Sequence, residues 1–258
     1  MEYALITGAS KGIGKAMAEC LAKRKFNLLL VARSEALLSE TAAELQRRYQ
    51  VAVSWLAADL STPEAPRLVA DWVAKNNFPI VVLINNAGYG LWGKFGELSY
   101  ADQNNMLQLN VQTLVNLTYL MLPNLKQRAK AYILNVGSLA GFQAIPTLSL
   151  YAASKALVNT FTRGLARELK NTPVSVTLLA PGGVKTGFLA RSGMYHMQQT
   201  DDKLSMKPEV VAEIGIRAML NGKREAVPGF LNRFTALMVK LFPKSVVENI
   251  TESMYKKK

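Results

Sequence analysis

The chain has 258 residues, 50% hydrophobic and 19% charged, which indicates one globular domain, or two small ones, and excludes a disordered chain. A lone Cys20 cannot form an intramolecular disulfide, which favours a reducing compartment, and one Cys with one His, His196, excludes the usual His/Cys metal sites. The net charge of +13 would suit nucleic acid, an anionic membrane or phosphorylated small molecules, but the basic residues are scattered and form no nucleic-acid-binding motif.

Short apolar segments alternate with longer amphipathic segments along most of the chain. The apolar segments predict strands over 3–7, 27–32, 51–56, 80–85, 131–136 and 174–180. The amphipathic segments predict helices over 13–25, 35–49, 63–75, 100–125 and 151–170. Strands that are apolar throughout and separated by helices form a parallel sheet covered on both faces. The predicted fold class is therefore α/β, a single-domain doubly wound parallel sheet.

Targeting and membrane-spanning segments are not expected. No run of about eighteen apolar residues occurs, and acidic Glu2 stands where a signal peptide would be basic. We expect a cytoplasmic protein with no transmembrane span, no bound metal and no nucleic-acid partner.

A glycine-rich turn joins the first predicted strand to the first helix. It reads Thr7-Gly8-Ala9-Ser10-Lys11-Gly12-Ile13-Gly14, with the spacing Gly-x-x-x-Gly-x-Gly. Glycines here let the backbone approach a pyrophosphate, whose charge is met by free amides at the helix N-terminus. The alternative is a tight turn of the kind found in any α/β protein, but the position at the first strand-to-helix junction favours a dinucleotide site.

Three further signatures follow in order. Asn85-Asn86-Ala87-Gly88 ends the fourth strand, Ser138 precedes the pair Tyr151-x-x-x-Lys155, and Pro181-Gly182 precedes Thr186. Together with the glycine turn, these make the chain resemble the short-chain dehydrogenase/reductase family over residues 2–187. The resemblance implies a Rossmann fold and an oxidoreductase that transfers a hydride between a nicotinamide cofactor and a carbonyl or alcohol substrate.

The residues themselves suit this chemistry. Tyr151 and Lys155 are four apart on a predicted helix, so they share a face, and an ammonium beside a phenol lowers the phenol pKa from about 10 towards neutrality. Such a Tyr can exchange a proton with a carbonyl oxygen that Ser138 also binds, while the hydride must come from a cofactor. The alternative interpretation of Tyr151 and Lys155 is an exposed pair on a helix without a catalytic role. The alternative function of the whole protein is a catalytically idle NADP(H)-binding sensor or scaffold.

Two residues take their roles from the resemblance alone. Asn110 matches an Asn whose backbone carbonyl holds a water linking the Lys to solvent, although a mid-helix Asn is commonly polar surface. Asp59 matches an adenine-contacting Asp, and a helix cap explains it equally well. The expected catalytic set is therefore Ser138, Tyr151, Lys155 and Asn110.

The end of the second strand indicates NADP(H). An acidic residue there would bind the ribose hydroxyls of NAD, whereas Arg33 can pair with the 2′-phosphate of NADP, and Lys11 brings a second cation. The residues expected to contact the cofactor lie at the ends of the strands: Gly8, Ser10, Lys11, Gly12, Ile13, Gly14, Arg33, Ser34, Asp59, Leu60, Asn86, Ala87, Gly88, Tyr151, Lys155, Pro181, Gly182, Val184 and Thr186.

The substrate is expected to meet residues 187–207, the position of the family's variable lid. The aromatic and Met side chains of this segment suit an apolar or acyl-chain-like substrate, and its notable residues are Phe188, Leu189, Met194, Tyr195, His196 and Met197. Of these, His196 is interpreted as an ordinary polar residue and not as a catalyst.

The C-terminal residues predict an additional amphipathic helix. A short strand over 225–228 precedes Phe230 to Phe242, whose apolar residues recur every three or four positions until Pro243. We divide the chain into a Rossmann-type NADP-binding catalytic domain, residues 1–228, and a C-terminal amphipathic helical extension of the same domain, residues 229–258. The apolar face either packs on its own domain or a second subunit of a homo-oligomer, or lies on a membrane surface as a peripheral contact.

Overall fold

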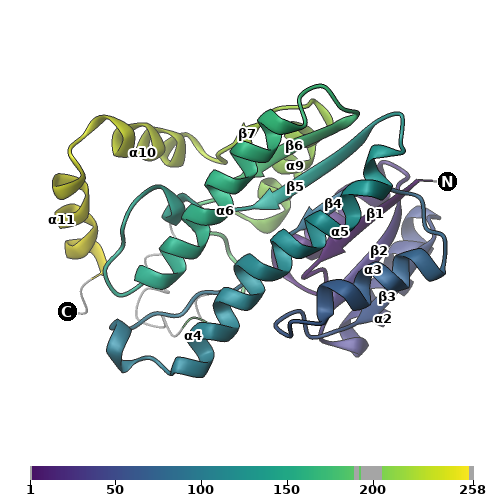
Figure 1. Ribbon diagram of the computed structural model, residues 1–258, viewed down its shortest axis with the longest axis horizontal. Coiled ribbons are helices and arrows are strands. Elements are labelled where there is room, and N and C mark those ends of the chain that lie inside the picture. The colour runs from purple at the N-terminus through teal and green to yellow at the C-terminus, as the bar shows by residue number, and fades with distance from the viewer. Residues whose placement is uncertain (1, 189–191, 193–204, 256–258) are drawn as a thin grey trace.

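A computed structural model of the chain describes residues 2–188, 192 and 205–255. Seven strands form one parallel sheet in the order β3-β2-β1-β4-β5-β6-β7 (Figure 1). The strands are β1 Tyr3–Thr7, β2 Asn27–Ala32, β3 Val53–Ala57, β4 Ile80–Asn85, β5 Ala131–Val136, β6 Val174–Leu179 and β7 Glu225–Ala226. The chain builds outward from β1 to β3 and then returns to β4 on the other side of β1. Ligands of such sheets bind beyond the carboxyl ends of the strands at this switch point.

Helices cover both faces of the sheet, because successive side chains of each strand point to opposite faces. Leu5 of β1 belongs to the core under helices α3, α5 and α6, whereas Ala4 and Ile6 belong to the core under α1, α2 and α9. The helices are α1 Gly12–Lys23, α2 Glu35–Tyr49, α3 Ala65–Lys75, α4 Tyr100–Leu107, α5 Leu114–Lys126, α6 Ser149–Glu168, α9 Pro208–Leu220, α10 Phe230–Leu241 and α11 Lys244–Tyr255. This confirms the doubly wound α/β fold with a helical extension.

Several predicted bounds are corrected. The helix expected over 13–25 ends at Lys23, since Lys25 adopts a left-handed conformation with φ of 65°. The strand expected over 51–56 lies at Val53–Ala57, the helix expected from residue 63 begins at Ala65, and the helix expected over 151–170 is Ser149–Glu168. Each of these bounds is displaced by two residues or fewer, because the ends of helices and strands are the least well defined parts of an element.

The helix expected over 100–125 is confirmed in its extent, because the chain is helical from Tyr100 to Lys126, but it is not α-helical throughout. A π-helical segment, η2 Gln108–Thr113, separates α4 from α5, and it contains Asn110. Helices α9 and α11 were not expected, and β7 is limited to two residues. The division at residues 228 and 229 stays a prediction.

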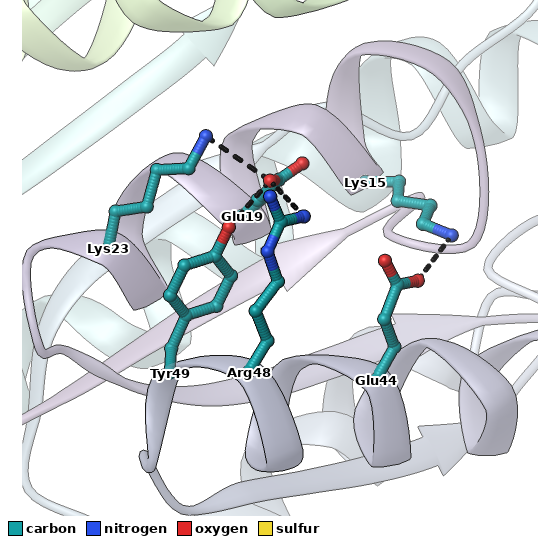
Figure 2. Close-up of polar contacts among 6 residues, drawn as sticks. All are labelled: Lys15, Glu19, Lys23, Glu44, Arg48 and Tyr49. Atoms are coloured by element: carbon teal, nitrogen blue, oxygen red, sulfur yellow. Dashed lines mark hydrogen bonds and ion pairs between the residues drawn. The ribbon is translucent and has the colours of Figure 1, made fainter.

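Polar contacts join α1 to α2, which lie side by side on the face of the sheet that α9 also covers (Figure 2). Glu19 Oε1 accepts a hydrogen bond of 2.7 Å from the Tyr49 hydroxyl and lies 3.0 Å from an Arg48 guanidinium nitrogen and 3.2 Å from Lys23 Nζ. The Tyr49 hydrogen bond is the main reason that the pKa of Glu19 lies below its usual value. These contacts fix α1, which begins at the glycine turn, against α2, which begins just after Arg33.

Candidate active site

The glycine turn and the segment after β4 form one hydrogen-bonded unit. The Thr7 hydroxyl oxygen accepts hydrogen bonds from the backbone amides of Asn86, at 2.9 Å, and Ala87, at 3.1 Å. The Asn86 side chain donates to the carbonyl oxygens of Thr7, at 2.9 Å, and Gly8, at 3.2 Å. The ends of β1 and β4, on either side of the switch point, are therefore held together by side-chain contacts that the sequence signatures supply.

Each glycine of the turn is required for its own reason. Gly8 and Gly12 have φ of 66° and 55°, a region that other residues rarely adopt. Gly14 lies so close to the turn that a Cβ atom there would be 2.2 Å from the Gly8 carbonyl oxygen. Only glycines therefore allow the turn to pack this closely on the start of α1, and the free amides at a helix N-terminus are groups that can bind a pyrophosphate.

Lys155 is buried beneath the site. Its side chain comes from the second turn of α6, and Nζ donates a hydrogen bond of 2.9 Å to the carbonyl oxygen of Val136, at the end of β5. A Cβ atom on Gly88 would lie 3.5 Å from the same Nζ. Burial lowers the pKa of Lys155 from 10.5 to about 8. The ammonium therefore remains the main form at neutral pH.

Tyr151 lies one turn before Lys155 on α6 and is 8% exposed. Its ring is 5.4 Å from that of Phe188, measured between centroids, and a Cβ atom on Gly90 would lie 3.4 Å from the Tyr151 ring. The apolar contact with Phe188 brings the segment after β6 against the same helix. Of the residues expected to meet the substrate, Leu189, Met194, Tyr195, His196 and Met197 lie outside the described residues.

Ser138 is held in place by a residue that sequence reasoning missed. The Asn159 side chain accepts from the backbone amide of Ser138 at 3.4 Å and donates to its carbonyl oxygen at 3.1 Å. The hydroxyl oxygen of Ser138 accepts from the backbone amide of Ala140 at 3.0 Å, within the short helix η3 Leu139–Phe142. Asn159 is four residues after Lys155, so helical spacing was a signal that could have identified it.

Asn110 is buried, at 1% exposed, and is not polar surface. Its side chain accepts from the backbone amide of Tyr89 at 3.0 Å and donates to the carbonyl oxygen of the same residue at 2.9 Å. It also donates to the Ser154 hydroxyl at 3.2 Å, which donates in turn to the carbonyl oxygen of Tyr151 at 2.7 Å. Asn110 therefore links the segment after β4 to α6. The water expected at its backbone carbonyl stays a prediction.

The residues expected to contact the adenosine lie at the ends of β2 and β3. Arg33 directly follows β2 and is exposed, as is Lys11 in the glycine turn. Asp59 is exposed, and its carboxylate accepts from the Ser61 amide at 3.0 Å and hydroxyl at 2.7 Å. The helix-cap alternative for Asp59 is wrong, because α3 begins six residues later. The Leu60 carbonyl accepts from the Thr113 hydroxyl at 2.6 Å, which ties the segment after β3 to η2.

The segment after β6 closes the site from the other side. The Pro181 carbonyl accepts from the Leu139 amide at 2.8 Å, and Val184 pairs with Met206 in an isolated bridge. A Cβ atom on Gly12 would lie 3.0 Å from the Thr186 methyl group, so Thr186 lies against the glycine turn. The expected residues Gly8 to Gly14, Asn86 to Gly88, Ser138, Tyr151, Lys155, Pro181 and Thr186 thus gather at one edge of the sheet.

Gly182 contacts a residue of the C-terminal extension. A Cβ atom on Gly182 would lie 2.6 Å from the side-chain oxygen of Asn232. The side-chain nitrogen of Asn232 donates a hydrogen bond of 2.7 Å to the Pro228 carbonyl. Sequence reasoning missed Asn232, and its position in a polar-apolar repeat carried no signal for this contact.

Comparisons with known proteins agree with this arrangement. A family model described as short chain dehydrogenase matches residues 2–197. A very-long-chain 3-oxoacyl-CoA reductase-B from Danio rerio is 34% identical over 189 residues, which are 72% of this chain and 60% of that protein. The chain thus spans only 60% of the length of that relative. Sulfoacetaldehyde reductase 2 from Chromohalobacter salexigens is 38% identical over 195 residues, 74% of this chain and 77% of that protein.

The same family contains a similar solved structure. A short-chain dehydrogenase from Sphingobium yanoikuyae in complex with NADPH superposes with a TM-score of 0.83 at 30% identity and covers 93% of each chain. With most of its length matched by the family model, and with the signatures gathered at one edge of the sheet, the chain belongs to the short-chain dehydrogenase family.

Proposed function

We propose that the protein is an NADPH-dependent reductase of ketones or aldehydes, with Tyr151 as the acid, Lys155 as the cation that stabilises the phenolate, and Ser138 as a ligand of the carbonyl oxygen. The observation that carries this proposal is the buried Lys155, held against the end of β5 two residues before Ser138 and one helical turn after Tyr151.

The site fits a nicotinamide dinucleotide. Gly8 and Gly12 adopt backbone conformations that other residues rarely adopt, Gly14 packs against the Gly8 carbonyl, and α1 begins at this turn, so its free amides would meet the pyrophosphate. Arg33 and Lys11 are exposed cations that would hold the 2′-phosphate, while Asn86 and Thr186 border the same turn. When bound, NADPH supplies the hydride, which no side chain can provide.

The side chains then account for the proton. Tyr151 donates its hydroxyl proton to the carbonyl oxygen as the carbonyl carbon is reduced, so the product is the alcohol and the residue is left as a phenolate. The nearby Lys155 ammonium favours that phenolate. Ser138, whose backbone Asn159 holds, donates a hydrogen bond to the same oxygen and orients it.

We infer that the substrate is apolar around its carbonyl group, because Phe188 packs beside Tyr151. The named relatives act on very different molecules by their names, a very-long-chain 3-oxoacyl-CoA and sulfoacetaldehyde. Both are reductases, so neither supports the alternative of a catalytically idle NADP(H)-binding protein. A homo-oligomeric assembly and a cytoplasmic location stay predictions.

Purified protein assayed with NADPH against ketones, aldehydes and acyl thioesters tests the activity. We expect NADPH oxidation that is greatest with apolar carbonyl compounds, whereas tight NADPH binding with no turnover on any compound would contradict the proposed activity.

A substitution at Arg33 tests the cofactor preference. Arg33→Asp should weaken NADPH binding far more than NADH binding, because it replaces a phosphate partner with a repelling charge. The matched control is Arg67→Asp, at an exposed Arg on α3. An equal loss for both cofactors would contradict the role of Arg33.

A further inference from the structure

Helix α10 is oriented with its large apolar side chains towards solvent. Phe230 is 81% exposed, Leu231 62%, Phe234 51%, Leu237 51% and Leu241 67%. A surface helix ordinarily turns such residues towards the core. The expectation that this face packs on its own domain is therefore wrong within the residues that the structure describes.

The opposite side of α10 explains this orientation. The residues that face the protein are both polar and apolar: Ala236 is buried, and Asn232, Thr235, Met238 and Val239 are half-buried. Asn232 lies against Gly182, and α10 also contacts η3, the short helix after Ser138. The helix is thus attached to the body by the side that carries Asn232 and Ala236, next to the candidate site. Figure 1 shows α10 and α11 at the left of the molecule, away from α2 and α3.

Positive charge accompanies the apolar face. Arg233 is exposed and is spaced three residues from Phe230 and four from Leu237, so it borders that face, and the α10 sequence contains no acidic residue. Arg233 also lines a surface groove of about 320 Å³ together with Arg217 and Lys223, between α9, β7 and the start of α10. Glu225 lines this groove too, but its carboxylate is paired with Arg163 at 2.8 Å, so the basic residues prevail. From Phe230 to the end, the sequence has six basic and two acidic residues.

We propose that the apolar face of α10, with the neighbouring cationic groove, docks the protein on an anionic membrane surface. The aromatic and Leu side chains would enter the boundary between headgroups and acyl chains, and Arg217, Lys223 and Arg233 would meet lipid phosphates. Apolar burial and charge are the two signals that stable peripheral binding requires.

The charge distribution favours a lipid surface over a second copy of the chain. Pairing two α10 faces would bring two basic faces together, on two chains that each carry a net charge of +13. Binding to an anionic lipid surface would instead be favoured both by the exposed apolar side chains of α10 and by its positive charge. Among the described helices, none has the length and apolar character needed to cross a bilayer, so the contact proposed is a peripheral one.

Vesicle sedimentation of the full chain tests this proposal, independently of any enzymatic activity. We expect binding to vesicles of phosphatidylcholine with about one third phosphatidylserine at low salt, weaker binding as salt is raised, and little binding to phosphatidylcholine alone. The double substitution Phe234→Ser with Leu237→Ser should reduce partitioning by more than about tenfold, because two apolar side chains no longer insert. Both positions are half exposed, so folding should be retained, as circular dichroism would verify.

The matched control is Leu68→Ser on α3, at a Leu that is also 51% exposed but lies on another part of the molecule. It should leave binding unchanged. The proposal is overturned if the unaltered protein remains in the supernatant with anionic vesicles at low salt, or if the double variant binds as well as the unaltered protein. A double variant that loses a dimer in analytical ultracentrifugation, with no vesicle binding in the unaltered protein, would assign the face to a second copy.

Discussion

The Nζ atom of Lys155 donates a hydrogen bond of 2.9 Å to the carbonyl oxygen of Val136. This contact fixes the ammonium at the end of β5, two residues before Ser138, although burial disfavours its charge. The same burial lowers the pKa of Lys155 to about 8. A cation kept in such a place at the expense of folding stability is typical of a functional site.

The cost of burying Lys155 should appear as a dependence of stability on pH. The unfolded chain holds this proton up to about pH 10.5 and the folded chain only to about pH 8, so stability from this group rises with pH between those values. Relative to Lys155→Met, the free energy of unfolding of the unaltered protein should increase by about 3 kcal/mol across this range. Urea unfolding of both proteins at several pH values measures it, and a difference that does not change with pH would refute the prediction.

Asn110→Leu should destabilise the fold and not merely slow catalysis. The substitution leaves the buried amide and carbonyl of Tyr89 without their side-chain partner, and each lost pairing costs about 1 to 3 kcal/mol. We expect a loss of at least about 2 kcal/mol in denaturant unfolding. Asn104→Leu, at an exposed Asn on α4, is the control and should change stability by less than about 0.5 kcal/mol. Equal effects of the two substitutions would show that the Tyr89 contacts are unimportant.

Two glycines in helices should respond to alanine in opposite directions. A Cβ atom on Gly14 of α1 would lie 2.2 Å from the Gly8 carbonyl oxygen, so Gly14→Ala should displace the glycine turn and lower both stability and NADPH affinity. Apart from the neighbouring residues of its own helix, no atom of the described residues lies within 4 Å of a Cβ on Gly164 of α6, so Gly164→Ala should raise stability by up to about 1 kcal/mol. Thermal unfolding with and without NADPH measures both, and a stabilised Gly14→Ala protein that binds NADPH normally would contradict this account of the turn.

The sequence was informative where local patterns determine structure. The six longer strands are mostly apolar because both sheet faces are covered, and the residues that follow them carry the signatures that meet at one edge. The interruption at η2 was not predictable from periodicity, since the pattern of apolar residues continues through it. Asn110 is fixed there by Tyr89, which is 21 residues away in the sequence.

The C-terminal extension shows a second limit of sequence reasoning. Periodicity predicted that α10 has an apolar face, but only tertiary contacts decide which way that face points, and here Asn232 and Ala236 face the body instead. The expected end of this helix at Pro243 is confirmed, because α10 ends at Leu241. Helix α11, which begins at Lys244, was not expected, and its start agrees with the tolerance for Pro just before or at a helix start.

The most direct test of the proposed function is the rate of NADPH-dependent carbonyl reduction by Tyr151→Phe. Removing the hydroxyl removes the proton donor and leaves the ring contact with Phe188, so the rate constant should fall by about 10² to 10⁴ while the Kd for NADPH stays the same. Tyr119→Phe, at an exposed Tyr on α5, should behave as the unaltered protein. A Tyr151→Phe protein that kept most of its activity towards a good substrate would contradict the assignment of Tyr151 as the acid.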